Sequence, residues 1–334
     1  MARPVTGRPE APGRVLVVKL SSLGDVVHAI PSVAALARRF PEARVDWAVE
    51  PLAAPLVREL PFVEEAIVAG ARGAFAHGWS AWWDEVAALR ETLASRRYDL
   101  AVDLQGLLRS SLVTVLSRAA RRLGRGRWPW LHSPVAMYDR ATPHAIENTA
   151  RAVAALGIAP ETVFEDGLRA VAPLAARLRE RGDALGRELG LPRPYRALLP
   201  GASREAKRLP LREVALSTDL PLVVVGGEDA RGSGPDGAVD LAGRLGLLDS
   251  AAIALGADSA LGADSGLSHL TALLGGRVVG IFGPTRVSRV GLRGPRATNV
   301  SAPCGGCEER RCPRAKRCLA EALSSVASFP PSLS

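Results

Sequence analysis

Short runs of β-branched residues alternate with helical patterns along most of this chain, which constrains the fold strongly. In the first half, we expect extended runs at 14–19, 44–49, 66–69 and 98–104, and helices at 25–40, 79–96, after 106 and at 145–156. In the second half, we expect extended runs at 195–199, 221–225, 259–263 and 277–282, with short helices within 211–257. Pro31 is expected to break the first helix near its start. This alternation predicts mostly parallel sheets with helices on both faces.

A polar, Arg- and Gly-rich helical segment at 161–193 separates the two series. The chain has 334 residues, which suggests two domains at roughly 150 residues each. We expect a disordered extension at 1–13, an N-terminal domain at 14–165, a C-terminal domain at 166–300, and a Cys-rich segment with a helix at 301–334. Two doubly wound, Rossmann-like domains with a cleft between them would bind ligands at the carboxyl ends of their strands.

The net charge is +9, from 43 Lys and Arg against 34 Asp and Glu, and 47% of the residues are hydrophobic. This composition excludes a disordered chain and favours an anionic partner: nucleic acid, a phosphorylated small molecule or an anionic membrane surface. No apolar run approaches the roughly 18–20 residues of a membrane-spanning helix, and the first residues lack the apolar core of a signal peptide. We therefore expect a cytoplasmic protein.

The loop after the first extended run reads Lys19-Leu-Ser-Ser-Leu-Gly24-Asp25. Its serines and glycine permit a tight turn, and Asp25 stands where a helix begins. A carboxylate at that place is either an N-cap or a general base. The chain contains no P-loop motif, which excludes that type of nucleotide site.

Two loops in the second half carry residue types that bind anions. The loop after 195–199 contains Ser203 and Lys207, whose hydroxyl and ammonium groups can hold a phosphate, although a solvated basic loop is the alternative. The loop after 259–263 contains Asp264, Ser265 and Gly266 and leads into a helix, whose first amides can bind a diphosphate. His269 lies about one turn into that helix and can face the same ligand.

Other functions fit parts of the sequence. Asp264, Ser265 and His269 are hydrolase residue types, but the G-x-S-x-G elbow is absent and triad members usually lie far apart in sequence. Residues 118–127 hold five arginines before Trp128 and Trp130, a pattern that can bind nucleic acid, contact a lipid headgroup layer or form a solvated face.

All the cysteines of the chain lie within one short segment near its end. Four thiols can close a tetrahedral zinc site, although these spacings are not those of a common zinc finger. Such a site would be structural, because four thiolates leave no open position for a substrate. Reduced free thiols or a redox pair are the alternatives. The cysteines are Cys304, Cys307, Cys312 and Cys318.

Taken together, the motifs resemble glycosyltransferase family 9 and, more narrowly, its ADP-heptose:lipopolysaccharide heptosyltransferases. The resemblance covers residues 14–295 in the right order. The loop at 19–31 with VDWAVE at 45–50 is closer to heptosyltransferase I, which adds the first heptose to Kdo, whereas the cysteine-rich tail is closer to heptosyltransferase II. The matching segments are KLSSLGDVVHAIP at 19–31, YDLAVDLQGLLRS at 98–110, PGAS at 200–203 with KRLP at 207–210, GADSGLSHLTALLG at 262–275 and FGPT at 282–285.

The resemblance implies a GT-B fold in which the N-terminal domain binds the acceptor and the C-terminal domain binds an ADP-sugar. It implies inverting transfer that requires no metal or other cofactor, with Asp25 as the general base. The implied acceptor is an anionic glycolipid, Kdo-lipid A or its heptosylated form. The protein would then be peripheral on the cytoplasmic face of the inner membrane and would not bind nucleic acid.

The same resemblance assigns roles to further residues. On the donor side, Ser203 and Lys207 match the phosphate loop, and Glu228 matches the carboxylate at the adenosine ribose. The loop at the diphosphate and sugar is matched by Asp264, Ser265, Gly266 and His269. The residues expected to face the acceptor are Lys19, Ser22, Gly24, Gln105 and Arg109.

Overall fold

The structure is a computed structural model that describes residues 11–69, 79–124, 133–134, 144–214, 216, 218–314 and 316–326. Most of the expected N-terminal extension, residues 125–130 of the Arg- and Trp-rich run, and the end of the chain lie outside these residues. Within them, no helix is long and apolar enough to cross a membrane.

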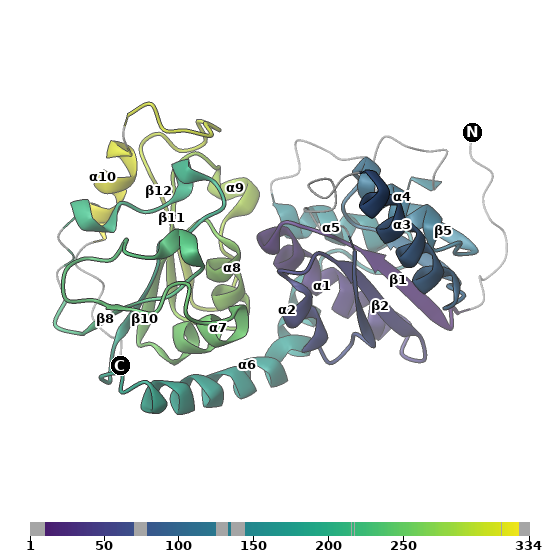
Figure 1. The fold of residues 1–334 in the computed structure, drawn as a ribbon, viewed down its shortest axis with the longest axis horizontal. Helices are drawn as coiled ribbons and strands as arrows, with labels where there is room; N and C mark the ends of the chain where they lie inside the picture. The colour runs from purple at the N-terminus through teal and green to yellow at the C-terminus, as the bar shows by residue number, and fades with distance from the viewer. Residues whose placement is uncertain are drawn as a thin grey trace.

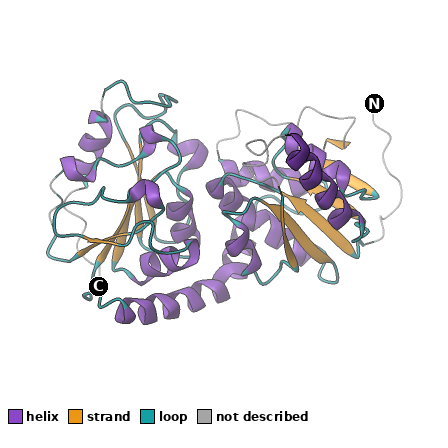
Figure 2. Cartoon of the chain, in the orientation of Figure 1, coloured by secondary structure: helices purple, strands orange, loops and turns teal. Residues whose placement is uncertain are grey.

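Two parallel sheets form the scaffold (Figures 1 and 2). The first has the order β3-β2-β1-β4-β5-β6 and contains β1 (Arg14–Val18), β2 (Arg44–Val49), β3 (Glu65–Val68), β4 (Leu100–Asp103), β5 (Arg121–Gly124) and β6 (Ser133–Pro134). The second has the order β12-β11-β10-β7-β8-β9 and contains β7 (Arg196–Leu199), β8 (Leu222–Val224), β9 (Val239–Asp240), β10 (Ser259–Ala263), β11 (Val278–Phe282) and β12 (Ala297–Ser301). Counted along the chain, both sheets have the doubly wound order 3-2-1-4-5-6. The predicted fold class, α/β with two Rossmann-like domains, is confirmed.

Helices cover the sheets and connect them (Figure 2). In the first domain these are α1 (Leu23–Arg39), α2 (Ala54–Arg58), α3 (Trp79–Ala94), α4 (Leu108–Leu116) and α5 (Ala145–Ala154). The rest are α6 (Val163–Glu188), α7 (Leu247–Gly256), α8 (Gly266–Leu273), α9 (Val287–Val290) and α10 (Arg317–Ser325). Among the described residues of 211–257 the structure has two single 3-10 turns and one α-helix, as the compact spacing predicted.

Pro31 does not break the first helix, so that expectation was wrong. Helix α1 continues through it to Arg39. Proline removes one backbone donor from the helix, but the buried ring packs directly against Gly167 of α6. A Cβ at Gly167 would lie 2.6 Å from the Pro31 Cα, so glycine makes room for this contact.

Four strands were not predicted, namely β5, β6, β9 and β12. Two of them have only two residues, and β12 is an edge strand without a fully buried residue. β5 lies inside the arginine-rich run, where its first residue is exposed. None of these strands has the continuous buried apolar pattern that marks β1 or β10. β6, β9 and β12 are edge strands, which do not require that pattern, whereas β5 lies between β4 and β6 and is only partly buried.

Helix α6 joins the two domains and packs against both, as Figure 1 shows. Its first half contacts α1, and its second half packs on α7, where Gly182 lies against the backbone of Ala252. The predicted boundary after residue 165 falls in the first turn of α6. Helix α10 packs on the second domain through the buried side chains of Leu319 and Leu323.

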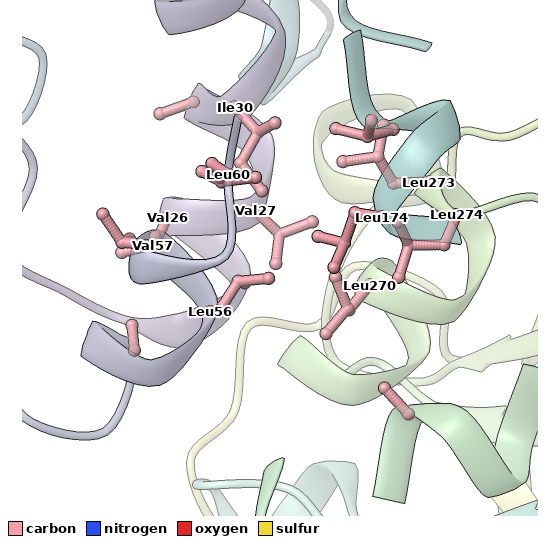
Figure 3. Close-up of a cluster of buried hydrophobic side chains, with 14 of the residues drawn as sticks. Val26, Val27, Ile30, Leu56, Val57, Leu60, Leu174, Leu270, Leu273 and Leu274 are labelled. Atoms are coloured by element: carbon pink, nitrogen blue, oxygen red, sulfur yellow. The ribbon is translucent and has the colours of Figure 1, made fainter. Parts of the chain in front are cut away.

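One buried apolar cluster continues from the first domain into the second. Figure 3 shows side chains of α1 and α2 facing those of α6 and α8. Val27 of α1 and Leu270 of α8 are 2% and 0% exposed. The two domains therefore share a buried apolar contact, and the amino-terminal ends of α1 and α8 lie beside it.

Candidate functional site

The candidate residues gather where the strand order of each sheet reverses. In the first sheet that point lies between β1 and β4, and in the second it lies between β7 and β10. Ligands of doubly wound sheets bind at the carboxyl ends of the strands at this switch point. The loops after β1, β4, β7 and β10, together with the first turns of the helices that follow them, carry the donor-side and acceptor-side residues predicted from the sequence, except Glu228.

Asp25 lies in the first turn of α1, three residues after the N-cap Ser22. Its Oδ2 accepts hydrogen bonds from the backbone N–H and the hydroxyl of Ser22, at 3.1 and 2.9 Å. Asp25 is therefore part of a capping arrangement without being the N-cap itself. Within the described residues, its Oδ1 has no hydrogen-bond partner, and the side chain is only partly buried. Capping by one oxygen leaves the other able to act as a base.

The predicted acceptor-side residues surround the same loop. Gln105 Oε1 accepts the backbone N–H of Leu20 at 2.7 Å. Arg109 donates to Glu50 Oε1 at 2.6 Å and to the hydroxyl of Ser21. Lys19 is 7% exposed. Gln105 and Arg109 thus hold the loop in place, and Ser22 and Arg109 are the exposed members of the group.

Asp264 is the centre of the second-domain site. It is 6% exposed, and its Oδ2 accepts from Lys207 Nζ at 2.6 Å and from the hydroxyl of Thr285. Its Oδ1 lies 3.1 Å from Nε2 of His269. Burial alone would raise the pKa of Asp264, but the hydrogen bond from His269 and the charge of Lys207 hold that pKa below its usual range. Asp264 is therefore ionised at neutral pH.

The remaining donor-side residues lie around this centre. Ser265 is the N-cap of α8, where its Oγ accepts the backbone N–H of Ser268 at 3.4 Å, and Gly266 is the first helical residue. Ser203 is exposed on the loop that leads to Lys207. Glu228 lies apart in the turn after β8, where it is exposed and pairs with Arg231 at 3.2 Å.

Two glycines let the loops of the two domains touch. A Cβ at Gly24 would lie 3.3 Å from Cδ2 of His269, and a Cβ at Gly266 would lie 2.4 Å from the side chain of Leu23. Any larger residue at Gly266 would push α8 away from α1. The amino-terminal ends of the two helices therefore meet directly, which brings the loop of Asp25 beside the loop of Asp264.

Sequence reasoning missed several polar residues of this region. Glu50 directly follows β2 and Thr285 follows β11, so their positions at strand ends could have indicated them. His28 and His144 gave no such signal, because their side chains become important only through contacts between the domains. His28 Nε2 lies 3.3 Å from Nδ1 of His269.

The four cysteines line one small cavity together with Ala206, Gly283 and Pro284, next to the donor-side loops. The thiol of Cys304 lies within hydrogen-bonding reach of Cys318 and Cys307, and burial and these neighbours raise its pKa to about 12. Among the residues that the structure describes, no three His, Cys, Asp or Glu side chains form a group that could hold a metal ion. The residues thus show no preformed zinc site, and the expected zinc stays a prediction.

His144 fixes a second contact between the domains. It is 1% exposed, its Nδ1 accepts the backbone N–H of Ile146 at 3.2 Å, and its Nε2 lies 2.8 Å from the carbonyl oxygen of Gly291. The neutral imidazole with the proton on Nε2 satisfies both bonds. Burial lowers the pKa of His144 to about 4, and Arg293 contributes, although the bond to Gly291 opposes this.

We predict that the buried, neutral His144 makes the free energy of unfolding fall as the solution becomes mildly acidic. The unfolded chain takes up a proton near pH 6.5 and the folded chain only near pH 4, so the full contribution is present above pH 6.5 and is lost as the pH falls towards 4. The free energy of unfolding decreases by about 3 kcal/mol over this pH range. His144→Gln, whose amide can still donate to Gly291, should flatten this part of the profile of unfolding free energy against pH. Parallel profiles for the wild type and the variant would contradict the assignment.

Comparisons with known proteins agree with this arrangement. The family profile of glycosyltransferase family 9 (heptosyltransferase) matches residues 86–317. Lipopolysaccharide heptosyltransferase 1 of Pseudomonas aeruginosa is 31% identical over 324 residues, covering 90% of this chain and 87% of that protein. Lipopolysaccharide heptosyltransferase 1 of Escherichia coli K12 is 27% identical over 317 residues, covering 87% of this chain and 94% of that protein.

Solved structures of heptosyltransferases are also similar to this chain. E. coli heptosyltransferase WaaC with ADP is 25% identical with a TM-score of 0.66, covering 87% of this chain and 94% of that one. E. coli ADP-heptose lipopolysaccharide heptosyltransferase II is 20% identical with a TM-score of 0.70, covering 94% and 98%, and shows the likeness of fold. The expected GT-B fold is confirmed. Because the family profile matches more than half of the chain, the chain belongs to glycosyltransferase family 9.

Proposed function

We propose that the protein transfers heptose from ADP-heptose to the Kdo region of lipopolysaccharide by direct, inverting displacement. The observation that carries this proposal is the contact between the two helix ends. It brings a partly exposed carboxylate, Asp25, beside an anion-binding loop centred on Asp264. The relatives named lipopolysaccharide heptosyltransferase 1 and the similar structure with ADP support the choice of substrates.

The second domain supplies the charge that a departing diphosphate requires. Lys207, on the segment after β7, is held by Asp264, and α8 begins two residues after Asp264. The free backbone amides at the start of a helix bind anions. Ser203 adds a hydroxyl on the Lys207 loop. An ammonium group and helix amides stabilise the negative charge that develops on the leaving ADP. Glu228, at the end of the neighbouring strand β8, is the proposed partner of the adenosine ribose.

The first domain supplies the base. Asp25 Oδ1 takes the proton of an acceptor hydroxyl, whose oxygen attacks the anomeric carbon while the bond from that carbon to the diphosphate breaks. ADP leaves from the opposite face, so the anomeric configuration inverts. Oδ2 remains bonded to Ser22, which fixes the direction of the carboxylate during the transfer.

The acceptor we propose is an anionic glycolipid on a membrane surface, which the protein contacts peripherally from the cytoplasmic side of the inner membrane. Within the described residues, every exposed large apolar side chain belongs to the first domain. Leu107, Leu108 and Leu112 are exposed at the start of α4, beside Arg109 of the acceptor-side group. Apolar side chains next to a basic residue suit a lipid headgroup layer better than nucleic acid. Kdo-lipid A is the first choice of acceptor, and a heptosylated form is the second because the cysteine-rich tail is of the heptosyltransferase II type.

The test is turnover of ADP-heptose with Kdo-lipid A and with its heptosylated form, followed as ADP release. We predict that Kdo-lipid A is the better substrate and that Asp25→Asn lowers kcat by about 10²–10⁴-fold while ADP still binds, since asparagine keeps the cap but not the base. Lys207→Met should show the opposite pattern, with ADP affinity lower by about 10–100-fold.

The matched control is Asp249→Asn, which removes a carboxylate that pairs with Arg181 on α6, away from both loops. It should leave both kcat and ADP affinity unchanged. Near-normal turnover of Asp25→Asn would show that Asp25 is not the base. Absence of turnover by the wild type with both acceptors, despite ADP binding, would exclude the proposed acceptor class.

We further propose that transfer requires no metal or other cofactor, because Lys207 and the α8 amides provide the positive charge. The four cysteines are proposed to close around a structural zinc ion that draws them together on binding. Chelator treatment should leave wild-type turnover intact, and metal analysis of the reduced protein should find zinc. Turnover that requires an added divalent cation would contradict the first proposal, and metal-free protein would contradict the second.

A further inference from the structure

A buried pair of imidazoles links the two domains beside the site. His28 lies on α1 and His269 on α8, and they are 5% and 4% exposed. Their facing nitrogens, His28 Nε2 and His269 Nδ1, are 3.3 Å apart, and the ring centroids are 4.4 Å apart. Their sequence neighbours Val27 and Leu270, which Figure 3 labels in the buried apolar cluster, are 2% and 0% exposed. The pair is therefore shielded from water.

The chemistry of Asp264 sets the direction of this hydrogen bond. An ionised carboxylate can only accept, so His269 Nε2 carries the proton that it donates to Asp264 Oδ1. In the tautomer of His269 that carries its proton on Nε2, Nδ1 is an acceptor. His28 must donate its Nε2–H to that nitrogen, and the chain of donors runs from His28 through His269 to Asp264.

The packing of the core does not account for a histidine at position 28. Its Nδ1 is buried and has no hydrogen-bond partner among the described residues. An unsatisfied buried polar atom costs roughly 1–3 kcal/mol, a penalty that an apolar side chain of similar size would avoid. The hydrogen bond to His269 is thus the distinctive contribution of this imidazole. Burial and the neighbouring His269 and His144 keep the pKa of His28 well below its usual value, so it stays a neutral donor.

We propose that His28 is a positioning residue for the donor site. It acts from the opposite domain by holding His269 in the orientation that fixes Asp264, which in turn holds Lys207. His28 lies three residues after Asp25 on α1. The same helix therefore carries the base and the side chain that aligns the diphosphate loop, so that the two halves of the site assemble only when α1 and α8 are in contact. This inference rests on the proposed function of the donor loop.

Two variants separate positioning from packing. His28→Leu fills the space without a donor, and His28→Gln places an amide N–H2 near the position of Nε2. We expect His28→Leu to unfold at the wild-type temperature or above it, because the unsatisfied nitrogen is gone, yet to bind ADP about 3- to 10-fold more weakly and to have a lower kcat. His28→Gln should restore most of the affinity and turnover.

The control is Ser32→Ala on the same helix. Ser32 donates to the hydroxyl of Thr149 at 2.9 Å inside the first domain, and among the described residues its side chain makes no hydrogen bond to α8. This variant should lose some stability and keep its ADP affinity. Nitrogen NMR of selectively labelled histidines gives a readout that does not depend on activity: the wild-type His269 signals should show protonated Nε2 and a hydrogen-bonded, unprotonated Nδ1, and His28→Leu should shift the Nδ1 signal.

The inference is wrong if His28→Leu matches the wild type in ADP affinity and kcat. It is also wrong if His28→Leu and His28→Gln are impaired equally, or if the His269 signals do not change. Failure of the proposed function looks different: the wild type itself would not bind ADP or transfer heptose, while the NMR signals would still report the hydrogen bond between His28 and His269.

Discussion

Asp264 is a buried carboxylate, and a charge without water must be compensated by hydrogen bonds and opposite charge. Three loops supply the compensation: Lys207 follows β7, Thr285 follows β11, and His269 lies on the helix after β10. Satisfying one carboxylate therefore fixes the relative positions of three strand ends. Through His28 the same requirement reaches the other domain, where α1 also carries Asp25. The geometry of the site thus depends on a single buried charge.

The two domains repeat one topology but use their switch points differently. In the first, polar side chains such as Gln105 and Arg109 brace a loop whose exposed residues can meet an acceptor. In the second, an ammonium and a helix end form a site suited to diphosphate. Gly24 and Gly266 allow the two ends to touch. The proposed inverting transfer needs this division, because in a direct displacement the base and the leaving group act from opposite sides of the anomeric carbon.

Much of the fold and of the candidate site could be predicted from the sequence, for physical reasons that particular residues show. The strands at 44–49 and 259–263 have the predicted bounds because buried parallel strands are rich in apolar residues, as both of these are apart from Arg44, Asp46 and Ser259. The loops of Asp25, Lys207 and Asp264 were found because they follow such strands. Pro31 was misjudged because its tolerance depends on Gly167, which lies on another helix. His28 and His144 were missed because their role arises only from contacts between domains, which no local pattern reports.

The central claim is that Asp25 activates the acceptor for direct displacement at the anomeric carbon, with no covalent intermediate. The most direct test is the anomeric configuration of the transferred heptose. It can be determined from the one-bond carbon–proton coupling at the anomeric carbon, measured on the product formed from ADP-heptose of known configuration and Kdo-lipid A. The account predicts inversion relative to the donor. Retention of configuration would contradict it, because retention requires a second displacement that this arrangement does not provide.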